Sequence, residues 1–227
     1  MIVKITRQSD NFLLVGANTC VNCSERLTLY NDDRKHLNMD FQLYTGFTAV
    51  HDVASLYSMI DKLAKDYGLR AGAPILRDRR FAPILAQHLT EIRALPDADI
   101  NSIDTISKQF YKLARLFSKV LARDEFPEVS LSKLLHFVHP GSFWIVDSRV
   151  ETILGIWGYR TDFAGFGNFL KELFRDPEFE SFKTFLTRND RELVGNHPMN
   201  KLPYPFLKLL DKLLWTHTGD LLNLFSL

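Results

Sequence analysis

One segment near the middle of the chain has an apolar spacing that is typical of a helix. Between residues 103 and 122, apolar side chains recur every three or four positions, at Ile103, Ile106, Phe110, Leu113, Phe117 and Val120. This spacing places them on one face of an α-helix, and that face must be buried against other elements. The chain is therefore expected to fold around packed helices.

Helical spacing extends through most of the chain from residue 51 onward. A helix over 53–67 is expected to end at Gly68, and a helix over 80–95 is expected to start near Pro83 and end at Pro96. Further helices are expected over 131–138, 148–157, 166–174, 177–186 and 203–217.

The first 30 residues have a different pattern. Residues 2–6 and 12–16 are short β-rich pieces, and residues 26–30 alternate apolar with polar side chains. With 227 residues, 46% hydrophobic content and only 11 glycines, the chain can bury a sizeable core of Leu and Phe. The sequence predicts a mostly α fold with short β segments near the N-terminus.

The charge balance says little about partners, since 28 basic and 27 acidic residues give a net charge of +1. Any nucleic-acid surface must come from local clustering. The helix over 103–122 carries four basic residues opposite its apolar face: Lys108, Lys112, Arg115 and Lys119. They form either an ordinary solvated face or a ridge that contacts DNA phosphates.

Several classes of protein are disfavoured by what the sequence lacks. Cys20 and Cys23 are its only cysteines, so we expect neither a disulfide framework nor a four-ligand metal site. No long apolar run and no signal-peptide layout is present, which predicts a cytoplasmic protein without a membrane partner. No phosphate-binding or dinucleotide fingerprint occurs, and no cofactor is expected.

Residues 124–158 are the most informative stretch. Ser130 is expected to cap a short helix that carries Lys133, and Asp147 is expected to cap the next helix. Taken singly, Lys133 reads as an exposed helix lysine and Asp147 as a helix cap. The two lie 147 − 133 = 14 positions apart, on either side of one short connection.

This stretch resembles the active-site core of the helix-hairpin-helix DNA glycosylases, the superfamily of endonuclease III and the 8-oxoguanine glycosylases. Residues 126–133 stand where that family has its hairpin and catalytic lysine, and residues 145–150 stand where it has a Val-Asp pair opening a helix. Glu128 and Ser130 occupy the place of the hairpin glycines. The resemblance covers about 35 residues, and beyond them only the helical character agrees.

The resemblance implies a monomeric enzyme that flips a modified base out of double-stranded DNA and excises it. Lys133 would attack the sugar carbon C1′ and form a Schiff base, which allows strand nicking. Asp147 would stabilise the positive charge that develops on the sugar. An Asp147-only mechanism, in which Lys133 merely binds phosphate, stays open.

The resemblance also suggests residues around the base. Phe143, Trp144, Trp157 and Tyr159 are candidate walls, and His136, His139 and Asp162 are candidate readers of the base. Arg149 and Arg160 are candidate phosphate ligands, although core packing and surface ion pairs are the alternative roles for all of these residues.

The family fold implies two helical lobes around a cleft, one of about 1–69 plus 148–227 and the other of about 70–147. Among the substrates to consider is a glucosylated hydroxymethylcytosine of phage DNA, which needs a roomy and polar pocket. The alternative from another class is a non-catalytic helical DNA-binding or adaptor protein that uses the stripe from Lys108 to Lys119.

Overall fold

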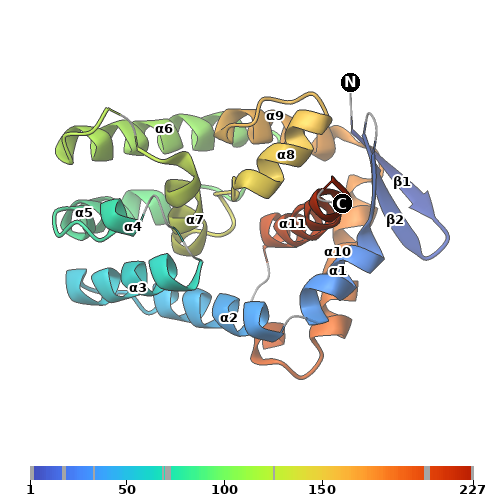
Figure 1. Ribbon diagram of the computed structural model, residues 1–227, viewed down its shortest axis with the longest axis horizontal. Helices are drawn as coiled ribbons and strands as arrows, with labels where there is room; N and C mark the ends of the chain where they lie inside the picture. Colours follow the sequence, from blue (N-terminus) through green and yellow to red (C-terminus); the bar gives the residue numbers. More distant parts are fainter. Residues whose placement is uncertain are drawn as a thin grey trace.

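The computed structural model describes the chain except residues 1–2, 17–18, 33, 68, 70–72, 125, 202–204 and 226–227. For residues 73, 201 and 219–225 only the backbone is described. The expected helix end at Gly68 lies outside the described residues. The fold is mostly α-helical, with one small sheet formed by residues near the N-terminus, as the sequence predicts (Figure 1).

The sheet is antiparallel and has the order β1-β2-β3. Its strands are β1 (Lys4–Gln8), β2 (Asn11–Val15) and β3 (Cys20–Asn22), and Ile5 pairs with Leu14, which pairs with Val21. These three residues are buried together with Phe12, because alternate side chains of a strand face the same side. Phe12 packs on Phe182 and Phe185, which anchors the sheet to α10 (Phe179–Val194).

The next segment differs from the prediction. Residues 26–30, expected to be extended, belong to helix α1 (Cys23–Asp32), and α2 (Arg34–Thr48) follows, although helices were expected only from residue 51. In α1 the buried residues are Cys23, Leu27, Tyr30 and Asn31, which is a helical spacing. The alternation that suggested a strand covers only five residues, too few to distinguish the two periods.

Three helices of the middle segment match their predicted positions: α3 (Val53–Asp66), α5 (Phe81–Arg93) and α6 (Ile103–Val120). The short α4 (Ala73–Leu76), between α3 and α5, was not predicted. Asp52 and Ser55 form a reciprocal capping box at the start of α3. Pro83 lies in the first turn of α5, where a missing N–H costs nothing.

Five α-helices and a short 3₁₀ turn follow in the rest of the described chain. They are α7 (Glu128–Val138), α8 (Ser148–Ile156), α9 (Phe163–Arg175), α10, a 3₁₀ turn η1 (Pro198–Lys201) and α11 (Phe206–Phe225). Helix α7 starts before Ser130, so the predicted cap is wrong: Pro127 occupies the cap position, and Ser130 is buried inside the first turn. Asp147 caps α8 as predicted.

Helix α11 packs against α1, α8 and α10. Figure 1 shows α3 to α6 at one end of the molecule and the sheet at the other, with α7 and α11 between them. Because α2 and α3 pack against α7 and α5, residues expected in the first lobe lie beside helices of the second. The division into two lobes stays a prediction. None of the described helices is both long and apolar enough to cross a membrane.

Candidate active site

Lys133 and Asp147 face each other. Lys133 Nζ lies 3.4 Å from Asp147 Oδ2, and the two side chains are only 11% and 10% exposed. Asp147 Oδ1 accepts hydrogen bonds from the backbone N–H groups of Arg149 and Val150 in the first turn of α8, which leaves Oδ2 directed to the lysine. The helix cap and the ion pair therefore use different oxygens of one carboxylate.

Two hydrogen bonds join helix α7 to the segment that leads into α8. The Ser132 hydroxyl, next to Lys133, donates to the carbonyl of Val146 and accepts from its N–H. Val146 directly precedes Asp147 in the chain. The neighbours of the lysine and of the aspartate are thus joined, which holds the two side chains in register.

The pair lines a pocket of about 130 Å³ that six segments of the chain build. Aromatic, apolar and charged side chains all contribute to it. The lining residues are Tyr30, His36, Met39, Asp66, Tyr67, Lys133, Ile145, Asp147, Lys208, Asp211 and Trp215.

Aromatic rings form one wall of this pocket. Trp215 makes edge contacts with Tyr30 and His36, at centroid distances of 6.0 and 5.2 Å. The Arg149 guanidinium stacks on Trp215 at 3.8 Å and donates to its backbone carbonyl. Lys133 Nζ lies 5.4 Å from the centroid of the Tyr67 ring. A planar group that enters the pocket would meet π faces and edges close to the lysine.

A buried charge network underlies this wall. Lys208 Nζ lies 3.0 Å from Asp211 Oδ2 and 3.3 Å from Asp40 Oδ2, and it is 3.4 Å from the Tyr67 hydroxyl. Both Tyr30 and Tyr67 donate to the Asp40 carboxylate. Burial alone lowers the pKa of Lys208, but Asp40 and the other neighbours outweigh it and raise that pKa well above its ordinary value. Lys208 is therefore a fixed ammonium.

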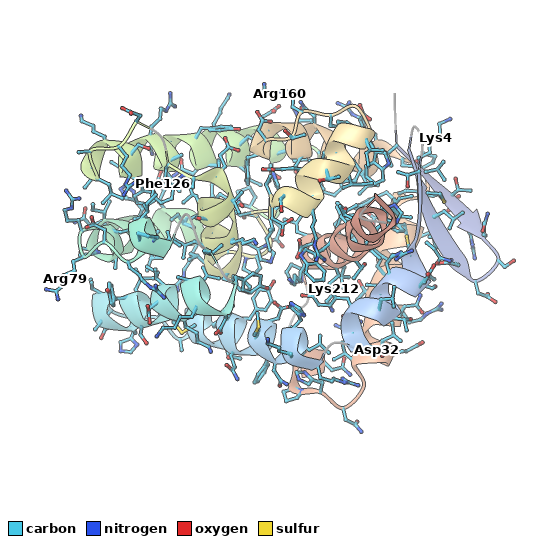
Figure 2. The ribbon with its side chains drawn as sticks, in the orientation of Figure 1. Lys4, Asp32, Arg79, Phe126, Arg160 and Lys212 are labelled. Carbon is cyan, nitrogen blue, oxygen red and sulfur yellow. The ribbon has the colours of Figure 1, made fainter. Side chains whose placement is uncertain are left out.

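A second buried lysine lies one turn further along α11. Lys212 Nζ lies 2.6 Å from Asp190 and 2.9 Å from the Asn31 side-chain oxygen, and Asn31 donates to Asp190 at 2.8 Å. Figure 2 shows Lys212 on α11, inside the molecule. This cluster ties α11 to α10 and α1, which also places the pocket residues of α11.

The predicted base walls lie in the core instead of the pocket. Phe143, Trp144 and Trp157 are at most 1% exposed. Trp144 stacks on Phe163 at 4.2 Å and donates its ring N–H to the Phe163 carbonyl. None of the three rings lines the pocket of Lys133 and Asp147, because the helices that they hold together cover them.

The other predicted base contacts also have structural partners and lie outside this pocket. His136 is fully buried between the Tyr44 hydroxyl and the Phe143 carbonyl, and burial lowers its pKa to about 3. His139 bonds to the Leu95 carbonyl.

Two further predicted contacts complete that set. Tyr159 donates to Glu172, and Asp162 caps α9 by accepting from the Gly165 N–H. Neither side chain lines the pocket.

The predicted DNA contacts are mostly at the surface. Lys108, Arg115 and Lys119 are exposed on α6, and so is Lys112, which pairs with Glu91 at 2.8 Å. Arg160 points outward beyond α8 and pairs with Asp162 (Figure 2). Arg149 is the one predicted DNA contact that touches a lining residue of the pocket, through Trp215.

Sequence reasoning missed most of the pocket. Tyr30, Tyr67 and Trp215 come from three distant segments, so no local pattern connects them. One signal was present: Asp211 and Lys212 follow Lys208 by three and four positions within the stretch 206–215, whose other residues are all apolar. Charges inside such an apolar stretch of helix indicate a buried polar site.

Comparisons of the chain with family models, with curated proteins and with solved structures give no match.

Proposed function

We propose that the protein is a DNA glycosylase that excises a modified base through Lys133 and Asp147. The observation that carries this proposal is the approach of the two side chains to 3.4 Å at the edge of a pocket with aromatic walls. A flipped base needs such walls, and bond cleavage at its sugar needs a nucleophile and a carboxylate beside them.

The chemistry follows from these positions. The base stacks against Tyr30, Tyr67 or Trp215, and its sugar carbon C1′ lies beside the pair. The Lys133 amine, having lost a proton to Asp147, forms a bond to C1′ as the bond to the base breaks. The electron pair of the broken bond leaves with the base, which takes up a proton from the new secondary ammonium and leaves a neutral secondary amine at C1′.

The bond between Lys133 and C1′ leads on to strand nicking in this mechanism. The secondary amine at C1′ loses a proton to the ring oxygen O4′ as the C1′–O4′ bond breaks, which gives a Schiff base. Loss of a proton from C2′ then expels the 3′ phosphate. In the monofunctional alternative, Asp147 stabilises the cationic sugar, water attacks C1′, and Lys133 only holds the DNA.

The pocket size supports a compact base. Its volume of about 130 Å³ is small beside the roughly 300–1,000 Å³ of sites for drug-sized ligands. A single modified ring suits this volume better than a glucosylated hydroxymethylcytosine. We therefore propose an oxidised or alkylated base in place of a sugar-bearing one.

The non-catalytic alternative rests on one observation. Lys108, Arg115 and Lys119 are exposed on one face of α6, as a phosphate-binding ridge requires. This surface is compatible with both functions, since a glycosylase also needs phosphate contacts.

The test is base release from duplex DNA that carries a panel of modified bases, followed as abasic sites, with borohydride to trap a Schiff base. Lys133→Gln should lower the yield of the trapped Schiff base at least about a hundredfold. Asp147→Asn should lower the rate of base release by at least the same factor. Asparagine caps helices as well as aspartate does, so the second change should spare α8.

Lys119→Ala separates chemistry from DNA binding: it removes a surface charge and leaves the pocket intact, so at saturating enzyme it should leave base release and trapping unchanged. Thermal denaturation checks that each variant folds. If no substrate yields abasic sites while DNA binding persists, the non-catalytic alternative is correct.

A further inference from the structure

Asp40, Lys208 and Asp211 form a buried network beside the pocket, here called the pocket floor, and one carboxylate oxygen of this network has no hydrogen-bond partner among the described residues. Asp211 Oδ1 is buried and makes no hydrogen bond within the described part of the chain, although Asp211 Oδ2 lies 3.0 Å from Lys208. Asp211 is 6% exposed, and it lines the pocket. A buried acceptor without a donor destabilises the structure around it, and a ligand that donates a hydrogen bond relieves this.

The surrounding groups cannot supply the missing hydrogen. The Lys208 ammonium donates hydrogen bonds to Asp211 Oδ2 and to the Tyr67 hydroxyl, and it forms an ion pair with Asp40 at 3.3 Å. The hydroxyl hydrogens of Tyr30 and Tyr67 are both donated to Asp40. Within this network the unused hydrogen-bonding capacity is therefore an acceptor.

The charge balance of the pocket floor also favours a hydrogen-bond donor on the ligand. Asp40 and Asp211 share one ammonium, that of Lys208, so the floor holds two carboxylates for one fixed cation. A hydrogen-bond donor on the ligand is stabilised here, and an electron-rich oxygen is repelled.

We infer that Asp211 reads the flipped base by accepting a hydrogen bond from its exocyclic amino group, so that the substrates are amino-bearing bases. This inference rests on the proposed glycosylase function. The amino group projects beyond the ring of the base, so it can reach Asp211 while the ring stacks on one aromatic lining residue such as Trp215. A base with an oxygen at that position would leave Asp211 unpaired and place two acceptors together.

An isosteric change inverts the polarity of the floor. In Asp211→Asn, Lys208 selects the amide oxygen, so the amide –NH₂ occupies the unpaired position and presents a donor. The variant should disfavour amino-bearing bases and favour bases with an oxygen at the same ring position. A purely structural role for Asp211 predicts a loss of stability without this reversal.

The experiment compares pairs of modified bases that carry either an amino group or an oxygen at this ring position, such as 5-hydroxycytosine and 5-hydroxyuracil, in otherwise identical duplexes. The ratio of kcat/KM for the amino base over the oxo base should be about ten- to a hundredfold in the wild type. It should fall to one or below in Asp211→Asn. Asp190→Asn is the matched control: it neutralises the carboxylate of the other buried lysine on α11, away from the pocket, and should leave the ratio unchanged.

A second measurement separates the inference from the proposed function. Free cytosine and uracil, and free adenine and hypoxanthine, are titrated into the wild type and Asp211→Asn, with binding followed by calorimetry. Tighter binding of the amino member by the wild type, reversed in the variant, supports the reading by Asp211 even if no base is excised.

The opposite results have distinct meanings. Excision without an amino preference overturns the inference and leaves the glycosylase function intact. The same is true of an amino preference that survives Asp211→Asn. If the protein neither excises nor binds any base, both the inference and the proposed function are overturned.

Discussion

The two buried lysines of α11 lie one turn apart, and their surroundings differ in one respect. Lys212, Asp190 and Asn31 form a closed triangle of hydrogen bonds. The cluster around Lys208 leaves Asp211 Oδ1 without a partner and lines a pocket. Complete pairing is typical of a structural cluster, whereas an open acceptor beside a cavity is typical of a binding site.

The closed cluster should matter most for stability. In Lys212→Met, Asp190 stays buried without its cation, so we expect the free energy of unfolding to fall by about 3–5 kcal/mol. Chemical denaturation measures this. The folded fraction should keep the base preference of the wild type.

Lys133→Gln sharpens the comparison. Its partner Asp147 remains anchored by the α8 backbone, and so unfolding should change much less than in Lys212→Met while activity is lost. Equal losses of stability in the two variants would mean that the Lys133–Asp147 pair is also a structural cluster.

The aromatic wall of the pocket beside Lys208 gives a third test of the comparison. Trp215→Ala removes the ring that contacts Tyr30 and His36. Stacking of a base on an aromatic ring is worth about 1–3 kcal/mol, so KM should rise about five- to a hundredfold. Steady-state kinetics on the best substrate measures this, and an unchanged KM would place the base elsewhere.

How far the sequence predicted these regions depends on how local they are. The amphipathic spacing of α6 and the capping by Asp147 are local, and both are confirmed. The nearness of Lys133 and Asp147 follows from one short connection between α7 and α8.

The pocket is not local. Tyr30 belongs to a helix that the sequence analysis took for an extended segment, and Trp215 lies 185 positions further along the chain (215 − 30). Aromatic residues close in sequence to Lys133 and Asp147, such as Trp144, were equally good candidates for a pocket wall. Their burial depends on tertiary packing, which local spacing does not encode.

His136 is a third buried polar group, and like Lys212 it has a hydrogen-bond partner on each side. With its proton on Nδ1, it donates to Phe143 and accepts from Tyr44. Burial lowers its folded-state pKa to about 3, below the usual value of the unfolded chain, so only the unfolded state binds a proton between these values. This contribution to stability is therefore full above about pH 6.5 and is lost as the pH falls toward 3.

The slope from this group should approach about 1.4 kcal/mol per pH unit in that window. His136→Gln should reduce the slope in denaturation measured from pH 7 to pH 4. An unchanged slope would assign the acid sensitivity to other groups.

The smallest effect is expected at the exposed stripe on α6. Lys119→Ala should weaken DNA binding a few-fold and reduce the slope of log affinity against log salt by about 0.9 if the lysine contacts a phosphate. Fluorescence anisotropy across a salt series measures this. Lys112→Ala should have less effect because Lys112 is paired with Glu91.

The most direct test of the central claim is the single-turnover rate of base release by Asp147→Asn, since Asp147 acts in both forms of the mechanism. The cap on α8 should survive, so a fall of at least about a hundredfold in a folded variant is the predicted result. Release at the wild-type rate would contradict the account, because it would leave Asp147 with no role beyond capping its helix.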